Sequence, residues 1–291
     1  MAADPDFDKV VLLLHADGTN GSTTFTDSSA TPKTAIAYNG AIISTAESKF
    51  GGSSLYFSGL TSHLRASPES AFTIGTDDFT MECWANYSSY SGARPLGLFN
   101  GTTGIVQMYI SSGALGTETR DAYGGAGGSV PLNEWVHLAV TRESGVVRSF
   151  INGTKVYEYT DSGSLGTPAQ VNINQYGNGG GSGGIGYIDE VRVTIGLARY
   201  TANFTPPTEA FTGAAAIALS GNVKDASGAN AARKVRAYRE DTGIFVGEAT
   251  SDGTTGNYSI TTLYSGAHTL VFYPAAGEDL PALILRGVVP V

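Results

Sequence analysis

The sequence has a single cysteine, few charged residues and only short apolar runs. Cys83 has no second cysteine to pair with, so no disulfide can form within the chain and packing must hold the fold together. It shares strand parity with Phe79 and Met81, which indicates a small buried side chain rather than a reactive thiol. The apolar run at residues 10–14 is too short for a signal peptide or a membrane span. We therefore expect a protein made in a cytoplasm, with no signal peptide and no membrane insertion.

Basic residues are also scarce. Lys and Arg number 17 against 26 Asp and Glu, which gives a net charge of −9, and they form no stripe along the chain. Binding to nucleic acid or to an anionic membrane would need such a stripe. The composition therefore argues against both kinds of partner.

The sequence does contain a series of short strand patterns. Hydrophobic residues make up 41% of the chain and glycine contributes 39 residues, a composition typical of strands joined by tight turns. Asn152 and Gly153 lie between two alternating segments and predict a two-residue hairpin. No long amphipathic helix is evident, so we predict an all-β fold. The predicted strands of the first part are residues 10–15, 54–57, 63–66, 79–86, 105–110, 135–142, 146–151, 154–159, 171–174 and 186–194.

A run of small residues at 211–218, after Pro206 and Pro207, predicts a domain boundary. We assign residues 1–213 to a first domain and residues 214–291 to a second. The second part shows six strand patterns, and a seventh strand is expected from the type of fold. Its edge strands would offer unpaired backbone groups to a partner, so we expect it to serve in attachment or oligomer contact.

Three long segments of the first domain are predicted to be loops, at residues 86–95, 115–130 and 176–184. Loops on a rigid β scaffold commonly carry binding residues. For the glycine-rich third loop, a flexible connection and a loop shaped around a ligand both stay open. Aromatic rings stack on sugar C–H faces, while amide and guanidinium groups meet hydroxyls. On this basis the candidate glycan-binding residues are Tyr87, Tyr90, Arg94, Asn100, Tyr109, Arg120, Tyr123 and Tyr176. Trp84 and Trp135 are expected to lie in the core.

Catalytic patterns are missing. Glycosidases of this general architecture place two carboxylates on one face of a strand, whereas Asp189 and Glu190 are adjacent and therefore point to opposite faces. Glu82 stands alone on its strand, and the four histidines have no metal-ligand or triad spacing. For His137 we predict a structural role, with a half-buried ring bonded to backbone. We expect no enzymatic activity.

Six segments in order carry a resemblance to a known family: residues 12–18, 49–59, 78–84, 134–142, 151–153 and 188–192. Together they resemble the laminin-G-like, concanavalin A-like jelly roll. Residues 198–207 (ARYTANFTPP) resemble the version found in bacteriophage virion proteins, and residues 282–291 also resemble phage structural proteins. The second domain resembles a carboxypeptidase-regulatory-like, transthyretin-like Greek-key β-sandwich. The resemblance implies a concanavalin A-like jelly-roll sandwich followed by a small C-terminal Greek-key β-sandwich.

The family resemblance also implies one structural calcium ion, held by a late-strand aspartate and oxygens near the first strand. Asp189 matches the late position, and Asp17 or its neighbours could supply the other oxygens. The alternative is that Asp189 caps a turn, or pairs with Arg192 or Arg65.

Combined, these features predict a non-catalytic bacteriophage virion protein, a tail-fibre or receptor-binding component whose jelly roll binds a host surface glycan. An alternative is a capsid decoration or neck protein that binds only other virion proteins. A bacterial surface adhesin is a weaker alternative, disfavoured by the missing export signal. A homo-oligomer is expected, although no heptad pattern supports it.

Overall fold

The computed structural model describes residues 4–67, 72–101, 103–120, 122–177, 181–213, 217–240, 243–262, 266–275 and 281–290. Across these residues the regular elements are strands, apart from one 3-10 turn, η1 (Phe7–Lys9). The predicted all-β class is therefore confirmed. None of the described helices is long and apolar enough to cross a membrane. The chain divides into a larger unit, Lys9–Phe211, and a smaller unit that comprises Thr212–Val291 and the first eight residues.

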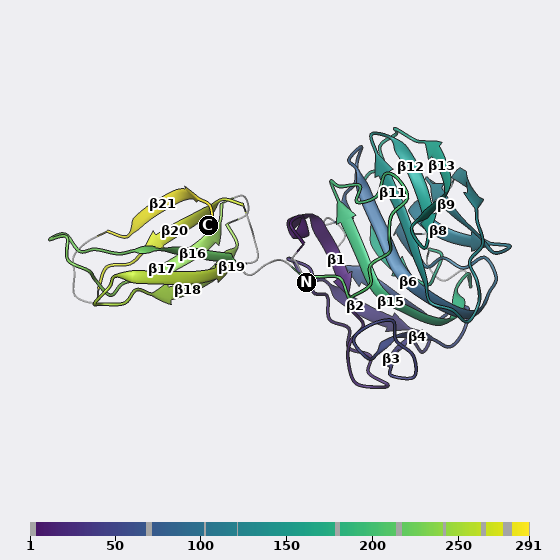
Figure 1. Cartoon of the computed structure of the whole chain (residues 1–291), viewed down its shortest axis with the longest axis horizontal. Coiled ribbons are helices and arrows are strands. Elements are labelled where there is room, and N and C mark those ends of the chain that lie inside the picture. The colour runs from purple at the N-terminus through teal and green to yellow at the C-terminus, as the bar shows by residue number, and fades with distance from the viewer. Residues whose placement is uncertain are drawn as a thin grey trace. The chain divides into compact units, whose positions relative to one another are not determined.

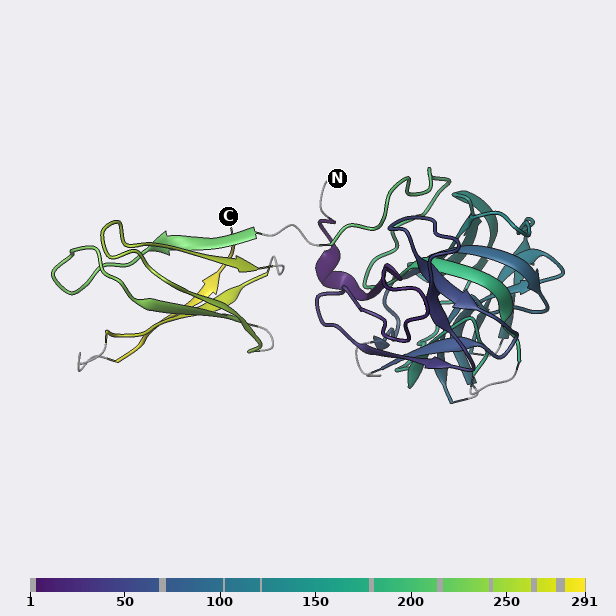
Figure 2. The same ribbon diagram turned by 90° about the horizontal axis from the view of Figure 1, so that it is seen from below.

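Two antiparallel sheets stack face to face in the larger unit (Figure 1 and Figure 2). Sheet A has the order β13-β12-β11-β6-β15-β4-β3, with β1 also paired to β15, and sheet B has the order β10-β9-β8-β7-β14-β5-β2. The strands of sheet A are β1 (Val10–Leu14), β3 (Ile42–Ser44), β4 (Ser54–Phe57), β6 (Phe79–Tyr90), β11 (Val136–Glu143), β12 (Val146–Ile151), β13 (Thr154–Thr160) and β15 (Gly184–Ile195). Those of sheet B are β2 (Thr34–Tyr38), β5 (His63–Ser67), β7 (Leu96–Asn100), β8 (Thr103–Ser111), β9 (Ala114–Thr119), β10 (Ala122–Gly127) and β14 (Gln170–Ile173).

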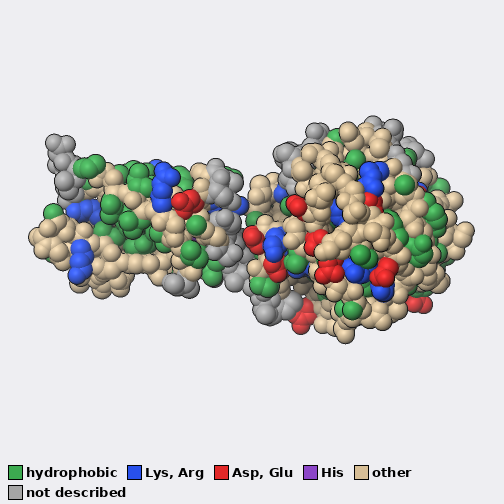
Figure 3. Space-filling view, turned by 90° about the horizontal axis from the view of Figure 1, so that it is seen from above, with side chains coloured by type: hydrophobic (Ala, Val, Ile, Leu, Met, Phe, Trp, Pro, Cys, Tyr) green, Lys and Arg blue, Asp and Glu red, His purple; other side chains and the backbone are tan. Residues whose placement is uncertain are grey.

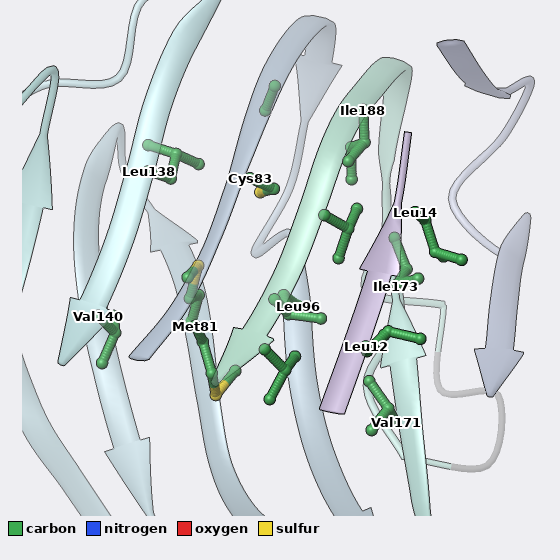
Figure 4. Packing of buried hydrophobic residues seen from close by; sticks show 14 of the residues in the cluster. Leu12, Leu14, Met81, Cys83, Leu96, Leu138, Val140, Val171, Ile173 and Ile188 are labelled. Atoms are coloured by element: carbon green, nitrogen blue, oxygen red, sulfur yellow. The ribbon is translucent and has the colours of Figure 1, made fainter. Parts of the chain in front are cut away.

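Alternation along each strand separates a core side from an outer side. On β6, Met81 and Cys83 point into the core, where Figure 4 shows them packing with Leu138 and Ile188. Burial raises the pKa of the Cys83 thiol above its ordinary value, so this cysteine is a packing residue as predicted.

The outer side of sheet A is covered by the end of the larger unit. This segment, residues 196–211, is called the strap below. The ring of Phe204 stacks on that of Tyr200 at 3.6 Å and packs edge-on against Phe150 of β12 at 5.4 Å, and the Thr141 hydroxyl on β11 donates to the Tyr200 carbonyl at 2.8 Å. The Phe204 amide donates to the Gly153 carbonyl at 2.9 Å, at the predicted hairpin turn between β12 and β13. The strap is therefore fixed to sheet A by both ring packing and backbone bonds.

The smaller unit has a two-stranded sheet, β16-β19, and a four-stranded sheet, β18-β17-β20-β21. Its six strands within the described residues are β16 (Ile217–Asn222), β17 (Lys234–Arg239), β18 (Phe245–Thr250), β19 (Asn257–Thr262), β20 (His268–Phe272) and β21 (Leu283–Val288). A small separate core forms between the two sheets, around Leu219, Val235, Ile260 and Leu270. The predicted seventh strand is not found among the described residues, and the transthyretin-like assignment stays a prediction.

Two of the three predicted loops were partly wrong. Strand β6 continues through residues 86–90, whereas residues 91–95 lie outside the strands as predicted, and most of residues 115–127 form the β9–β10 hairpin rather than a loop. The second segment was taken for a loop because it is rich in glycine. The strand needs glycine where a neighbouring ring leaves no room for a Cβ. A Cβ at Gly116 would lie 2.5 Å from the ring of Tyr109, which crosses the backbone at this point. Strands β2, β3 and β7 were not predicted either.

Candidate functional site

A row of paired residues, six of them with side chains, crosses the outer side of sheet B. Each member pairs directly with the next one on the neighbouring strand, so all of them point to the same side. That side is opposite to Val106 and Met108, which belong to the core. From β2 to β10 the row consists of Ile36, Arg65, Asn172, Gly97, Gln107, Glu118 and Tyr123. We call it the sheet B row.

Arg94 organises the polar part of the row. Its Nε donates to Gln107 Oε1 at 3.0 Å, and its Nη2 lies 3.3 Å from Glu118 Oε1. Gln107 in turn donates from Nε2 to Glu118 Oε2 at 2.6 Å. Burial lowers the pKa of Arg94, while the charge of Glu118 opposes that shift. Three planar polar groups are thus held in one fixed array.

Tyrosine rings surround this array. The Tyr109 ring lies 4.9 Å from the Arg94 guanidinium carbon and 5.2 Å from the Tyr123 ring. Tyr176 lies 5.6 Å from the Arg94 guanidinium and packs edge-on against Phe99. Tyr123 is 62% exposed, whereas Tyr109 is 4% exposed, so Tyr123 offers the accessible ring.

A second aromatic group lies near the other end of the row. Tyr38 and His63 stack in parallel at 4.7 Å, and the Arg65 guanidinium lies 5.2 Å from the Tyr38 ring. The Arg65 Nε donates to Asn172 Oδ1 at 3.4 Å. Rings and planar polar groups therefore alternate along most of the outer face of sheet B.

Four of the eight predicted candidates meet here: Arg94, Tyr109, Tyr123 and Tyr176. Asn100 is exposed at the end of β7, the strand next to β8.

The other three predicted candidates lie elsewhere. Tyr87 is a core residue, 1% exposed, whose hydroxyl donates to Asn174 Oδ1, so its ring has no face for a ligand. The Tyr90 hydroxyl donates to the Val130 carbonyl, and Arg120 forms an ion pair with Asp161.

Sequence reasoning missed Gln107 and Glu118. Gln107 sits between Val106 and Met108 in a strand that was predicted, so alternation alone could have placed it on the outer side. Glu118 could not be found in this way, because its strand was taken for a loop.

A separate polar cluster is buried between sheet A and the strap. Glu82 Oε1 lies 2.7 Å from Arg192 Nη2, and Glu82 Oε2 accepts from the Tyr200 hydroxyl at 2.9 Å and lies 3.1 Å from His137 Nε2. Burial favours a neutral Glu82, but Arg192 and His137 outweigh it and bring the pKa down to about 2. Glu82 and His137 have fully buried side chains, which leaves no access for a substrate.

This cluster corrects one prediction. Glu82 is the only carboxylate on its strand, as predicted, but the His137 ring is fully buried and meets a carboxylate rather than backbone. Trp84, expected in the core, is buried at 5% exposure on the outer side of sheet A, with the Lys49 ammonium 3.8 Å from its ring centre. Trp135 is partly buried.

The carboxylate of Asp189 accepts hydrogen bonds from three backbone amides. Its Oδ2 accepts from the Lys49 and Phe50 amides at 2.8 and 3.1 Å, and its Oδ1 accepts from the Glu190 amide at 2.9 Å. Asp189 thus caps the turn at Lys49 and Phe50, which was one of the predicted alternatives.

The other proposed ligand, Asp17, packs against the backbone of Gly51. Within the described ranges, no group of three or more His, Cys, Asp or Glu is placed to hold a metal ion. Calcium binding by Asp17 and Asp189 stays a prediction.

Comparison with known proteins supports the fold of the larger unit. Residues 57–195 match the family model of the concanavalin A-like lectin/glucanases superfamily, Laminin_G_3. This match and the two-sheet sandwich confirm the concanavalin A-like jelly roll. No curated protein matches the sequence.

Several solved structures are similar to this chain. Domain 4 of AbnA, a GH43 extracellular arabinanase from Geobacillus stearothermophilus in complex with arabinotriose, is 16% identical with a TM-score of 0.50, over 65% of this chain and 93% of that one. Trypanosoma rangeli sialidase is 14% identical with a TM-score of 0.47, over 65% of this chain but only 31% of the sialidase. The botulinum neurotoxin type G receptor binding domain is 12% identical with a TM-score of 0.48, over 97% of this chain and 79% of that one. At these identities the likeness concerns the fold alone.

Proposed function

We propose that this jelly roll binds carbohydrate through the outer face of sheet B and does not cleave it. The observation that carries the proposal is the exposed Tyr123 ring beside the fixed array of Arg94, Gln107 and Glu118. An exposed ring can stack on the C–H face of a sugar, and the partly exposed Arg94 and Glu118 beside it can meet the hydroxyls, while the buried Gln107 holds these two in place. The arabinanase domain with this fold was solved with arabinotriose, which supports the same use here.

Binding without cleavage follows from the carboxylates. Hydrolysis of a glycosidic bond by the common mechanism needs two carboxyl groups on either side of the bond. Glu118 is the only carboxylate in the sheet B row, and it is already bonded to Arg94 and Gln107. Glu82, with its histidine neighbour, is closed off beneath the strap.

The proposed setting is a bacteriophage particle, with the protein made in the host cytoplasm. There it would act as a tail-fibre or receptor-binding component that attaches to a host surface glycan. The strap sequence and residues 282–291, which resemble phage proteins, support this setting. A capsid decoration or neck protein is the second candidate, favoured by the incomplete sandwich of the smaller unit described below.

A glycan array probed with the full chain tests the carbohydrate proposal. We expect a set of related glycans to bind the parent protein, to be lost with Tyr123→Ala, and to be retained with Tyr56→Ala, a tyrosine on the outer side of sheet A. If the parent protein binds no glycan on the array and no host cell in a binding assay, the capsid decoration role is favoured. Release of sugar fragments from a bound polysaccharide would overturn the non-catalytic assignment.

A further inference from the structure

The two sheets of the smaller unit are unequal, with two strands facing four. Strand β19 lies against β18, at one edge of the four-stranded sheet. Its partner β16 is the second and last strand on that side among the described residues. The half of the larger sheet formed by β20 and β21 therefore extends beyond the sheet that should cover it.

The side chains of β21 show this imbalance. Leu283 pairs with Phe272 and Leu285 pairs with Leu270, so these four residues point to the same, inner side of the sheet. Leu270 is 1% exposed, whereas Leu283 and Leu285 are 59% and 42% exposed. Apolar residues on the inner side of a sandwich strand are normally buried by the opposite sheet. Here the apolar inner face continues past the strands that cover it.

A cavity of about 640 Å³ lies at this uncovered side. Its apolar wall includes Val223, Phe272, Leu283 and Leu285, and Lys224 and Arg233 contribute cationic residues to its lining. Asp225 also lines it, but its Oδ1 accepts hydrogen bonds from Ser227 and Ala229 within its own loop. The charged lining residues described are thus two cations and one carboxylate, and the hydrogen bond from Ser227, together with the charge of Arg233, helps to lower the pKa of Asp225. The lining therefore keeps an excess of one positive charge. Figure 3 shows hydrophobic side chains exposed on this unit, drawn at the left, with Lys and Arg side chains beside them.

The edge of β16 that faces away from β19 pairs with no strand within the described ranges. An open strand edge beside an apolar cavity is the arrangement that a third strand would complete. Such a strand would bond to β16 through its backbone and place every second side chain over Leu283 and Leu285.

We propose that an extended segment of another protein docks as this missing strand, with apolar residues at alternate positions and acidic residues between them. The apolar residues fill the cavity, and the acidic residues at its rim meet Lys224 and Arg233. The exposed apolar strand of this chain itself, β21, carries Arg286 and no acid. A second copy of β21 would therefore bring a like charge to a cationic rim, which favours a different protein as the partner.

Synthetic peptides of about eight residues, a usual strand length, test the proposal on the full chain. The probe alternates valine with glutamate. One control alternates valine with lysine, and the other has the probe's composition with its valines adjacent. We expect the probe to bind at least tenfold more tightly than either control by calorimetry. Bound probe should slow amide hydrogen exchange along β16.

Two variants of β21 place the peptide on the inner face. Leu283→Asp should weaken probe binding at least tenfold, whereas Ile284→Asp, on the opposite face of the same strand, should leave it unchanged. Both parent side chains are more than half exposed, at 59% and 54%, so both variants should fold. Equal effects of the two variants, equal binding of the lysine peptide, or no binding by any peptide would each overturn the proposal. A dimer of the parent protein that Leu283→Asp alone dissociates would identify a second copy as the occupant instead.

Discussion

Each outer face of the jelly roll carries a glutamate paired with an arginine, but the two clusters differ in how deeply they are buried. On sheet A, Glu82 meets an arginine, a histidine and a tyrosine beneath the strap, and its side chain is fully buried. On sheet B, Glu118 meets Arg94 and Gln107 beside tyrosine rings, and both charged side chains keep some exposure, at 18% and 15%. The closed cluster fixes the strap to sheet A. We expect the partly exposed cluster on sheet B to exchange some of its contacts for those of a ligand.

Removing the central carboxylate of the closed cluster should produce the largest effect. Glu82→Ala leaves Arg192 and His137 buried without their partner, which we expect to cost about 3–5 kcal/mol of the jelly roll's unfolding free energy. Urea unfolding followed by tryptophan fluorescence measures this loss. The matched variant Glu118→Ala should cost clearly less, because solvent reaches its arginine. Equal losses would remove the distinction between the two faces.

The tyrosine of the strap gives a smaller, more local test. Tyr200→Phe keeps the ring stacked on Phe204 but removes the hydrogen bond to Glu82, for an expected cost of about 1.5–3 kcal/mol because the acceptor is charged. Limited proteolysis should also cut the strap faster in this variant. Tyr187→Phe serves as control, since within the described residues its hydroxyl has no hydrogen-bond partner, and it should change neither measurement.

The sequence indicated the sheets better than it indicated what lies on them. The strand at residues 146–151 was found to the residue because its β-rich sequence ends at the clear turn signal of Asn152 and Gly153. Strands β9 and β10 were missed because their glycines make room for tyrosine rings from other strands. The Glu82 cluster joins residues 55, 110 and 118 positions apart, and only the completed fold brings them together. The sheet B row likewise depends on the register of seven strands.

The Glu82 cluster and the region around Asp189 should contribute to stability with opposite pH dependence. Burial raises the pKa of Asp189 to about 7 from 3.8, and the bond to Glu190 raises the pKa of His15. Both groups hold their proton more tightly in the folded state, so their contributions to stability are present at low pH. That of Asp189 is lost as the pH rises from 3.8 to about 7, and that of His15 as the pH rises above 6.5. Glu82 acts in the opposite sense, since its contribution is lost only as the pH falls from 4.5 toward 2.

Thermal melts of the parent and Asp189→Asn across this range measure the difference. The variant keeps an oxygen that accepts from Lys49 and Phe50 but does not titrate, so its midpoint should decline less as the pH rises. A parallel decline in both proteins would show that Asp189 does not cause it. Calcium bound here would favour the ionised carboxylate and remove the decline, so melts with EDTA and with added calcium also test the predicted ion. An unchanged midpoint argues against calcium.

Arg94→Lys should have the smallest effect on stability and a clear effect on binding. Lysine keeps the charge but lacks the planar fork that holds Gln107 and Glu118 together, so we expect a loss of about 1 kcal/mol in stability, the net value of a typical hydrogen bond. Affinity for a glycan identified on the array should fall about tenfold, or about 1.4 kcal/mol in binding free energy. Arg148→Lys is a matched control on sheet A, where the arginine is 13% exposed and pairs with Glu143 and Glu158, and it should leave glycan affinity unchanged. If the two variants bind equally well, the fixed polar array is structural like the one beneath the strap, and the exposed ring of Tyr123 alone distinguishes the open face.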